Sequence, residues 1–83
     1  MEVQEITEKL KGLIETYVED KAAFANINAE THLIEDLKIN SAHLVDIILD
    51  AEEVFDIEID DESAEKMLTV QAAVDVVAQK LAE

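Results

Sequence analysis

The sequence predicts an all-α fold, a small bundle of three long helices and one short helix. Apolar side chains recur at helical spacing in three segments, residues 3–19, residues 41–55 and the stretch from residue 70 onwards. The chain has no proline and one glycine, so few residues interrupt these patterns. With 83 residues and 49% hydrophobic content, the chain can build one small core, and we expect a single domain over residues 1–83.

The first long helix is expected from Val3 to about Glu19. Its apolar face consists of Ile6, Leu10, Leu13, Ile14, Tyr17 and Val18. Residues 20–39 then form a long connection that is too apolar for a free linker, with Phe24, Ile27, Leu33, Ile34, Leu37 and Ile39. We expect these side chains to pin the connection across the bundle, with a helical turn after Thr31, because long structureless loops are uncommon in compact domains.

The second long helix is expected from Ser41 to Phe55, with Asn40 as its N-cap. At about 100° per residue, one arc of this helix is apolar and should face the core: Leu44, Ile47, Ile48, Ala51, Val54 and Phe55. A second face gathers three acids, Asp46, Asp50 and Glu53. Between these acids and Ser41 runs a smaller apolar strip of Ala42, Val45 and Leu49.

The alternation of acids and apolar residues over 56–60 could indicate a strand, but the chain offers no segment to pair with it. We therefore expect an extended loop that docks Ile57 and Ile59 on the bundle. Asp60 or Asp61 should then cap a short helix through Lys66. Thr69 should cap the last helix, with a core face of Val70, Ala73, Val74, Val77 and Leu81.

The charge balance excludes several classes of function. Twenty-one acids against six Lys and Arg give a formal charge of −15, which argues against nucleic-acid binding and for basic partners reached by electrostatic steering. There is no Cys, hence no thiol catalyst, disulfide or Cys-based zinc site. The N-terminus lacks the apolar run of a signal peptide and no stretch reaches the length of a membrane span. We expect a soluble, cytoplasmic monomer without membrane insertion.

Residues 31–77 resemble the acyl carrier protein family. The resemblance runs from Thr31 to Leu37, through Ser41 with its following acids, to the segments at residues 52–62, 64–66 and 69–75. The family's core motif is Asp-Ser-Leu. This chain has Asn40 and Ala42 on either side of the serine, and Lys38 where the family often has Gly. Asn40 keeps the capping chemistry, since Asn and Asp are near-equal N-caps.

The resemblance implies that Ser41 is the attachment point of a 4′-phosphopantetheine arm, on which acyl groups are held as thioesters. It implies a carrier for fatty-acid, lipid or polyketide-type synthesis rather than an enzyme, and an interior, around residues such as Ala51, Ile59 and Val74, that shelters the acyl chain. A helix N-terminus suits the phosphate of such an arm. The departures from the motif indicate a specialised member with a restricted set of partners.

The expected partners are a phosphopantetheinyl transferase and acyl-transferring or acyl-condensing enzymes with basic docking patches. We predict that they dock on a surface that we call the ridge, made of Ala42, Val45, Asp46, Leu49, Asp50, Glu52 and Glu53. The alternative interpretation of the ridge is a solvated helix face. The alternative for the whole chain is an unmodified acidic helical interaction domain with the same fold.

Two other kinds of site are not favoured. His43 lies two residues after Ser41, and residues at this spacing do not face each other on a helix, so a Ser–His nucleophile pair is not expected. A calcium loop starting at Asp56 would need Gly at its sixth position and Glu at its twelfth, where the chain has Asp61 and Met67. We expect no dedicated metal site, and His43 is expected to be an exposed polar residue.

Overall fold

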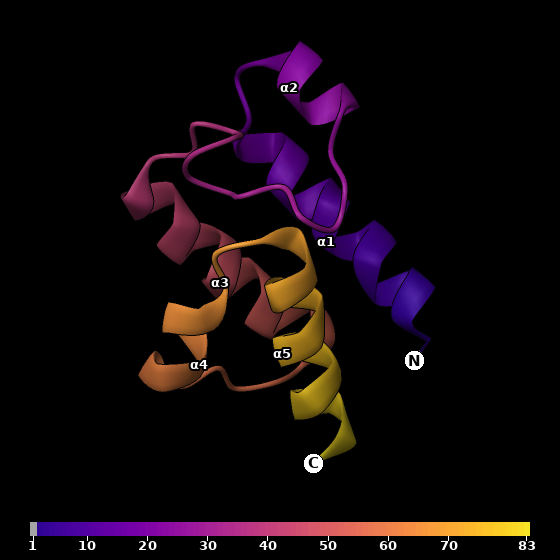
Figure 1. Ribbon diagram of the computed structural model, residues 1–83. Coiled ribbons are helices and arrows are strands. Elements are labelled where there is room, and N and C mark those ends of the chain that lie inside the picture. The colour runs from indigo at the N-terminus through magenta and orange to yellow at the C-terminus, as the bar shows by residue number, and fades with distance from the viewer. Residues whose placement is uncertain (1) are drawn as a thin grey trace.

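The computed structural model describes residues 2–83. The only regular secondary structure in this part of the chain is helical, and one isolated backbone bridge joins His32 and Thr69. The helices are α1 (Val3–Tyr17), α2 (Lys21–Ala25), α3 (Ser41–Phe55), α4 (Asp61–Lys66) and α5 (Val70–Ala82). The predicted all-α bundle is confirmed, with its three long helices and short α4. In Figure 1, α2 and the connection after it lie at the opposite end of the bundle from α4 and the C-terminus.

Helix α2 was not predicted, because it lies inside the expected connection 20–39. Its five residues are too few to show an apolar period, but an N-terminal cap explains why the helix forms. The Asp20 carboxylate accepts hydrogen bonds from the backbone N–H groups of Ala22 and Ala23, at 3.0 and 3.2 Å. An Asp in this position satisfies N–H groups that a helix start otherwise leaves unpaired.

The core lies where α1 meets α3 and α5. Residues 2–83 bury seventeen hydrophobic side chains there, among them Ile6, Leu10, Ile14, Leu44, Ile47, Ala51, Phe55, Val70, Ala73, Val74 and Val77. The predicted core faces are therefore largely confirmed. Val54 is an error in that prediction, since 46% of it is exposed, and Ile48 is only half-buried. Both lie at the edges of the buried arc of α3, where the neighbouring helices no longer cover the surface.

The connection between α2 and α3 is pinned as expected, with Leu33, Leu37 and Ile39 buried. Backbone hydrogen bonds tie it to the start of α5: the Leu33 N–H donates to the carbonyl of Leu68 at 2.9 Å, and the Val70 N–H donates to the carbonyl of Thr31 at 3.1 Å. The turn expected after Thr31 is also present, because the Asp36 N–H donates to the His32 carbonyl at 2.9 Å. The chain thus enters α3 from a fixed direction.

Asn40 and Thr69 cap α3 and α5 as predicted. The Asn40 side chain accepts a hydrogen bond from the Ala42 N–H at 2.8 Å, and the Thr69 hydroxyl accepts one from the Ala72 N–H at 3.1 Å. The first helix ends at Tyr17, two residues before the expected boundary. Asp60 occupies the position before α4, as expected, but its side chain makes no capping hydrogen bond to that helix. Residues 57–60 form the expected loop, with Ile57 and Ile59 half-buried against the core.

Asp56 ends α3 in the left-handed conformation, with φ 54° and ψ 53°. Glycine adopts this region without steric cost, and a negative charge at a helix C-terminus is unfavourable. We therefore expect Asp56→Gly to raise the free energy of unfolding by about 1 kcal/mol in urea denaturation. Asp56→Ala removes the same charge without the glycine's freedom, so an equal gain in that variant would contradict the backbone explanation.

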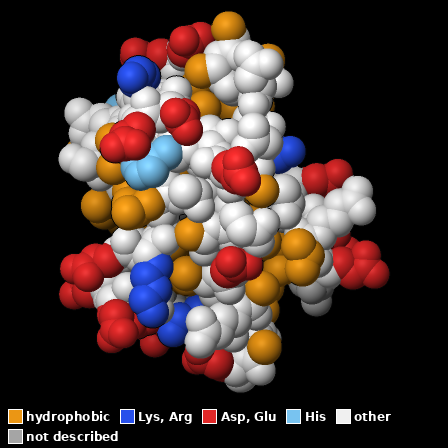
Figure 2. Space-filling model, in the orientation of Figure 1, with side chains coloured by type: hydrophobic (Ala, Val, Ile, Leu, Met, Phe, Trp, Pro, Cys, Tyr) orange, Lys and Arg blue, Asp and Glu red, His pale blue; other side chains and the backbone are white. Residues whose placement is uncertain are grey.

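Acidic side chains greatly outnumber Lys and Arg on the face that Figure 2 shows. The net charge of −15 must repel itself in a molecule whose Cα radius of gyration is 11.6 Å. Raising NaCl from about 0.02 to about 0.5 M is expected to increase the melting temperature by about 5 °C, because screening shortens the reach of this repulsion. A melting temperature that stays constant or falls in calorimetry would contradict this prediction.

Within residues 2–83, no helix combines the length and hydrophobicity needed to cross a membrane.

Candidate functional site

Ser41 is the first residue of α3 and its side chain is exposed. The chain reaches it through Lys38, which adopts φ 59°, the left-handed region that favours glycine. Lys38 thus keeps the backbone course that a glycine would take at this position. The backbone of Asn40 is extended, and its side chain caps α3 by accepting the Ala42 N–H. Ser41 therefore lies at a well-defined helix start, with its side chain in solvent.

The first turn of α3 can accommodate a phosphate. Asn40 satisfies the N–H of Ala42, and the Leu44 N–H donates to the Asn40 carbonyl at 3.0 Å. Among residues 2–83, no acceptor pairs with the backbone N–H groups of Ser41 and His43. These two donors, together with the positive end of the helix dipole, suit an anionic group attached to the serine hydroxyl. The residues present therefore fit a phosphodiester at Ser41.

The ridge residues fall into two groups. Five of them are exposed along α3: Ala42, Val45, Asp46, Leu49 and Glu53. Val45 and Leu49 are 55% and 56% exposed, and because they lie four residues apart they share one face of the helix. The other two, Asp50 and Glu52, are half-buried, and each carboxylate accepts a hydrogen bond from another element.

Tyr17 of α1 adds a residue to the edge of the ridge that sequence reasoning assigned to the core. It is half-buried, and its hydroxyl donates to Asp50 Oδ2 at 2.9 Å. That hydrogen bond, followed by partial burial and the negative charges of Asp50 and Asp46, raises the pKa of the Tyr17 hydroxyl. Its ring also contacts the exposed ring of His43, with centroids 5.5 Å apart and planes tilted by 41°. In the sequence, the one signal for this contact was that Tyr17 places a phenol hydroxyl at the polar edge of an apolar helix face.

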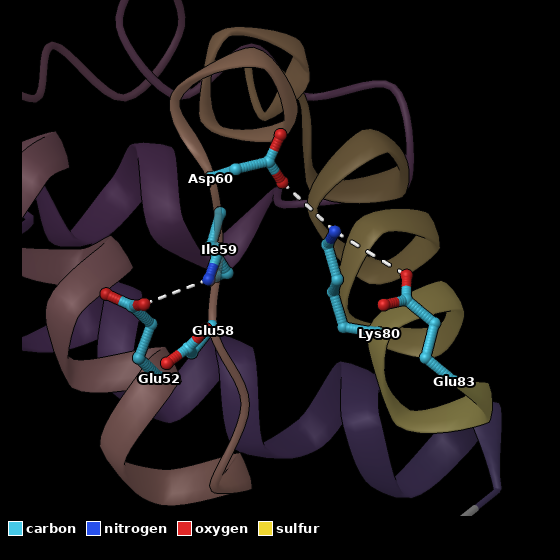
Figure 3. Close-up of a pocket in the computed structure, with 6 residues that line it drawn as sticks. All are labelled: Glu52, Glu58, Ile59, Asp60, Lys80 and Glu83. Carbon is cyan, nitrogen blue, oxygen red and sulfur yellow. Dashed lines mark hydrogen bonds and ion pairs between the residues drawn. The ribbon is translucent and has the colours of Figure 1, made fainter.

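A cavity of about 430 Å³ lies at the other end of α3, between α3, the loop 56–60 and the C-terminal end of α5. Figure 3 shows the six residues that line it, Glu52, Glu58, Ile59, Asp60, Lys80 and Glu83. At 1.5 Å per residue, Glu52 is roughly 16 Å from Ser41 along the helix axis. The cavity is thus separate from Ser41. Of the residues expected around sheltered cargo, Ala51 and Val74 are buried in the core and Ile59 lines this cavity.

One lysine lies among the four acids that line this cavity. The Lys80 ammonium lies 3.0 Å from Asp60 Oδ1 and 3.5 Å from Glu83 Oε2. The hydroxyl of Ser63, and then Lys80, hold the pKa of Asp60 below its usual value, and Asp60 in turn raises the pKa of Lys80. Because the carboxyl pKa is lowered, the pair stabilises the fold above about pH 4, and this stabilisation is lost as the pH falls further.

Nowhere in residues 2–83 do three or more His, Asp or Glu side chains converge as metal ligands would.

Comparison with known proteins gives the same family as the motif around Ser41. No family model matches the chain. It is 41% identical over 75 residues to an acyl carrier protein from Desulforapulum autotrophicum, covering 90% of this chain and 86% of the relative. It is 42% identical over 77 residues to an acyl carrier protein from Rubrobacter xylanophilus, covering 93% and 84% of the two chains.

A further relative, an acyl carrier protein from Picosynechococcus, is 38% identical over 77 residues, or 93% of each chain. Among solved structures, an acyl carrier protein from Enterococcus faecalis superposes with a TM-score of 0.79 at 29% identity, over 96% of this chain and 99% of that one. Sequence and fold thus agree over nearly the whole chain. The chain belongs to the acyl carrier protein family.

Proposed function

We propose that this chain carries acyl groups as thioesters on a 4′-phosphopantetheine arm joined to Ser41. The observation that supports this most directly is the exposed serine at the start of α3, in a chain of the acyl carrier protein family. Beside it are two backbone N–H groups that find no acceptor within residues 2–83. When bound, the arm supplies the thiol that this cysteine-free chain lacks. Ser41 holds the arm through its hydroxyl, and the first turn of α3 stabilises the phosphate charge.

The chain has the role of a platform, and catalysis belongs to its partners. We propose that a phosphopantetheinyl transferase loads Ser41, and that acyl-transferring or acyl-condensing enzymes of fatty-acid, lipid or polyketide-type synthesis then dock on the ridge. Exposed Val45 and Leu49 offer apolar contacts beside the acids, and a basic docking patch matches the chain's −15 charge. A cytoplasmic monomer fits this role. Ala42, in place of the family's larger apolar residue, points to a restricted set of partners.

Intact-mass spectrometry tests the proposed modification. The purified chain is incubated with coenzyme A and, in separate reactions, with several phosphopantetheinyl transferases. We expect a gain of one phosphopantetheine unit per chain with at least one transferase. No gain with any of them would contradict the carrier function and favour the unmodified interaction domain.

Reversing one charge on the ridge tests the docking surface. Asp46 is exposed beside Val45, so Asp46→Lys should place a cation against the basic patch of a partner. We expect the KM of the transferase for the carrier to rise by on the order of tenfold at low salt, with the melting temperature unchanged. The matched control is Glu30→Lys, which makes the same charge change at an exposed loop residue. An equal rise in KM for both variants would show a net-charge effect and contradict docking at the ridge.

A further inference from the structure

A histidine side chain caps the turn 32–37, in the connection between α2 and α3. His32 Nδ1 accepts hydrogen bonds from the backbone N–H groups of Ile34 and Glu35, at 3.3 and 3.1 Å. In return, the Asp36 carboxylate accepts the His32 backbone N–H at 2.7 Å. The two side chains therefore cap the turn reciprocally, much as in a capping box, with an imidazole where a Ser or Thr hydroxyl is usual.

This turn fixes the direction from which the chain enters α3. The His32 carbonyl accepts the Leu37 N–H at 3.2 Å, and Leu33, Leu37 and Ile39 are all buried. Ser41 follows Ile39 by two residues. Loss of the cap therefore loosens the segment that leads directly to Ser41, while α1, α3 and α5 keep their own contacts.

An imidazole can cap this turn only while it is neutral. The neutral ring has one nitrogen that accepts a hydrogen bond, whereas both nitrogens of the protonated ring carry a hydrogen. A proton on Nδ1 would face the N–H groups of Ile34 and Glu35, so both hydrogen bonds would be lost. Histidine side chains ordinarily take up this proton as the pH falls through the region around 6.5. His32 is half-buried, so the ring stays accessible to protons from solvent.

The charged groups around the ring favour its protonation. Three acids, Glu30, Glu35 and Asp36, lie within four residues of it along the chain. On the other side, residues 68–70 pair with the turn through backbone hydrogen bonds and carry no titratable side chain, and Lys66 is the first charged residue before them. The acids attract a proton to the ring, and the protonated ring cannot cap the turn. Mild acid therefore favours the uncapped turn.

We propose that His32 is a pH-sensitive cap, which fixes the approach to Ser41 while its ring is neutral and releases the turn 32–37 in mild acid. On release, the N–H groups of Ile34 and Glu35 turn to water, and the backbone hydrogen bonds of the turn remain without the imidazole. The inference rests on the proposed function only for its consequence, because partner enzymes then meet a less ordered approach to Ser41. The cap itself needs no arm.

Amide hydrogen exchange on the full chain, followed by NMR at pH 7.5 and pH 5.5, tests the cap. Exchange rates are converted to protection factors, which removes the direct effect of pH on exchange. Because the neutral fraction of an ordinary histidine falls about tenfold over this range, the protection of the Ile34 and Glu35 amides should fall by about as much. The ¹⁵N spectrum of the His32 ring shows when Nδ1 gains its proton. A ring that stays neutral at pH 5.5, or protection that stays constant while the ring is protonated, would overturn the proposal.

Three variants separate the imidazole from the rest of the turn. His32→Ala removes the acceptor and should show, at both pH values, the low protection that the parent shows at pH 5.5. His32→Ser supplies a hydroxyl that accepts at either pH, so its protection should exceed that of His32→Ala and change less than about twofold with pH. His43→Gln removes the other histidine of the chain and should leave the pH dependence of the parent unchanged.

An equal fall of protection with pH in His32→Ser would show that another group controls the turn, and the proposal would be wrong. A pH dependence that disappears in His43→Gln would contradict it as well. None of these measurements involves pantetheinylation. A failure of the pH-sensitive cap is thus distinguishable from a failure of the carrier function, which the mass measurement reports.

Discussion

Replacing Ser41 by Ala is expected to abolish pantetheinylation completely. The side chain is exposed at the first position of α3, and its hydroxyl is the proposed attachment atom, so no residual loading should remain. The fold should not change. Asn40, not Ser41, caps the helix, and alanine is a good helix former. Intact mass after incubation with coenzyme A and a transferase measures the first effect, and a thermal melt measures the second.

Ser63 provides the control for this variant, because it is the other serine of the chain. It lies within α4, where its hydroxyl contacts Asp60. Ser63→Ala should therefore still gain one phosphopantetheine unit. A mass gain that persists in Ser41→Ala, or that disappears in Ser63→Ala without unfolding, would contradict attachment at Ser41.

Of the substitutions proposed for this chain, Leu10→Ala should lower the free energy of unfolding most. Leu10 is fully buried on α1, the helix that packs against both α3 and α5. Large-to-small changes at such sites cost about 2–5 kcal/mol, and a domain of this length has roughly 4–12 kcal/mol in total. Urea denaturation should show a midpoint reduced accordingly, with much of the protein unfolded by 37 °C if the loss is at the upper end.

Leu49→Ala is the matched control, since it makes the same truncation at a residue that is 56% exposed. Its free energy of unfolding should change by less than about 0.5 kcal/mol. On the predicted ridge, the same variant should weaken partner docking. If Leu49→Ala destabilised the fold as much as Leu10→Ala, the assignment of the two faces would be wrong.

Much of the architecture could be predicted from the sequence because it depends on local patterns. The bounds of α3 were predicted correctly from Asn40 and the apolar period after it, and Thr69 marked the start of α5 in the same way. The loop 56–60 was predicted from the lack of any pairing segment. Helix α2 was missed, since a five-residue helix has no period to detect and depends on the Asp20 cap.

The sequence by itself determined the placement of Ser41 at the start of a helix, and it placed acids and an apolar strip along that helix beyond the serine. Capping and a period of 3.6 residues are properties of neighbouring residues, so they are readable without a fold. Only the tertiary structure decided which of those acids form hydrogen bonds with other parts of the chain and which do not. Asp50 is bound to Tyr17, 33 residues away, and Glu52 holds Ile59. These contacts arise from the packing of α1 and of the loop 56–60 against α3, which no local pattern specifies.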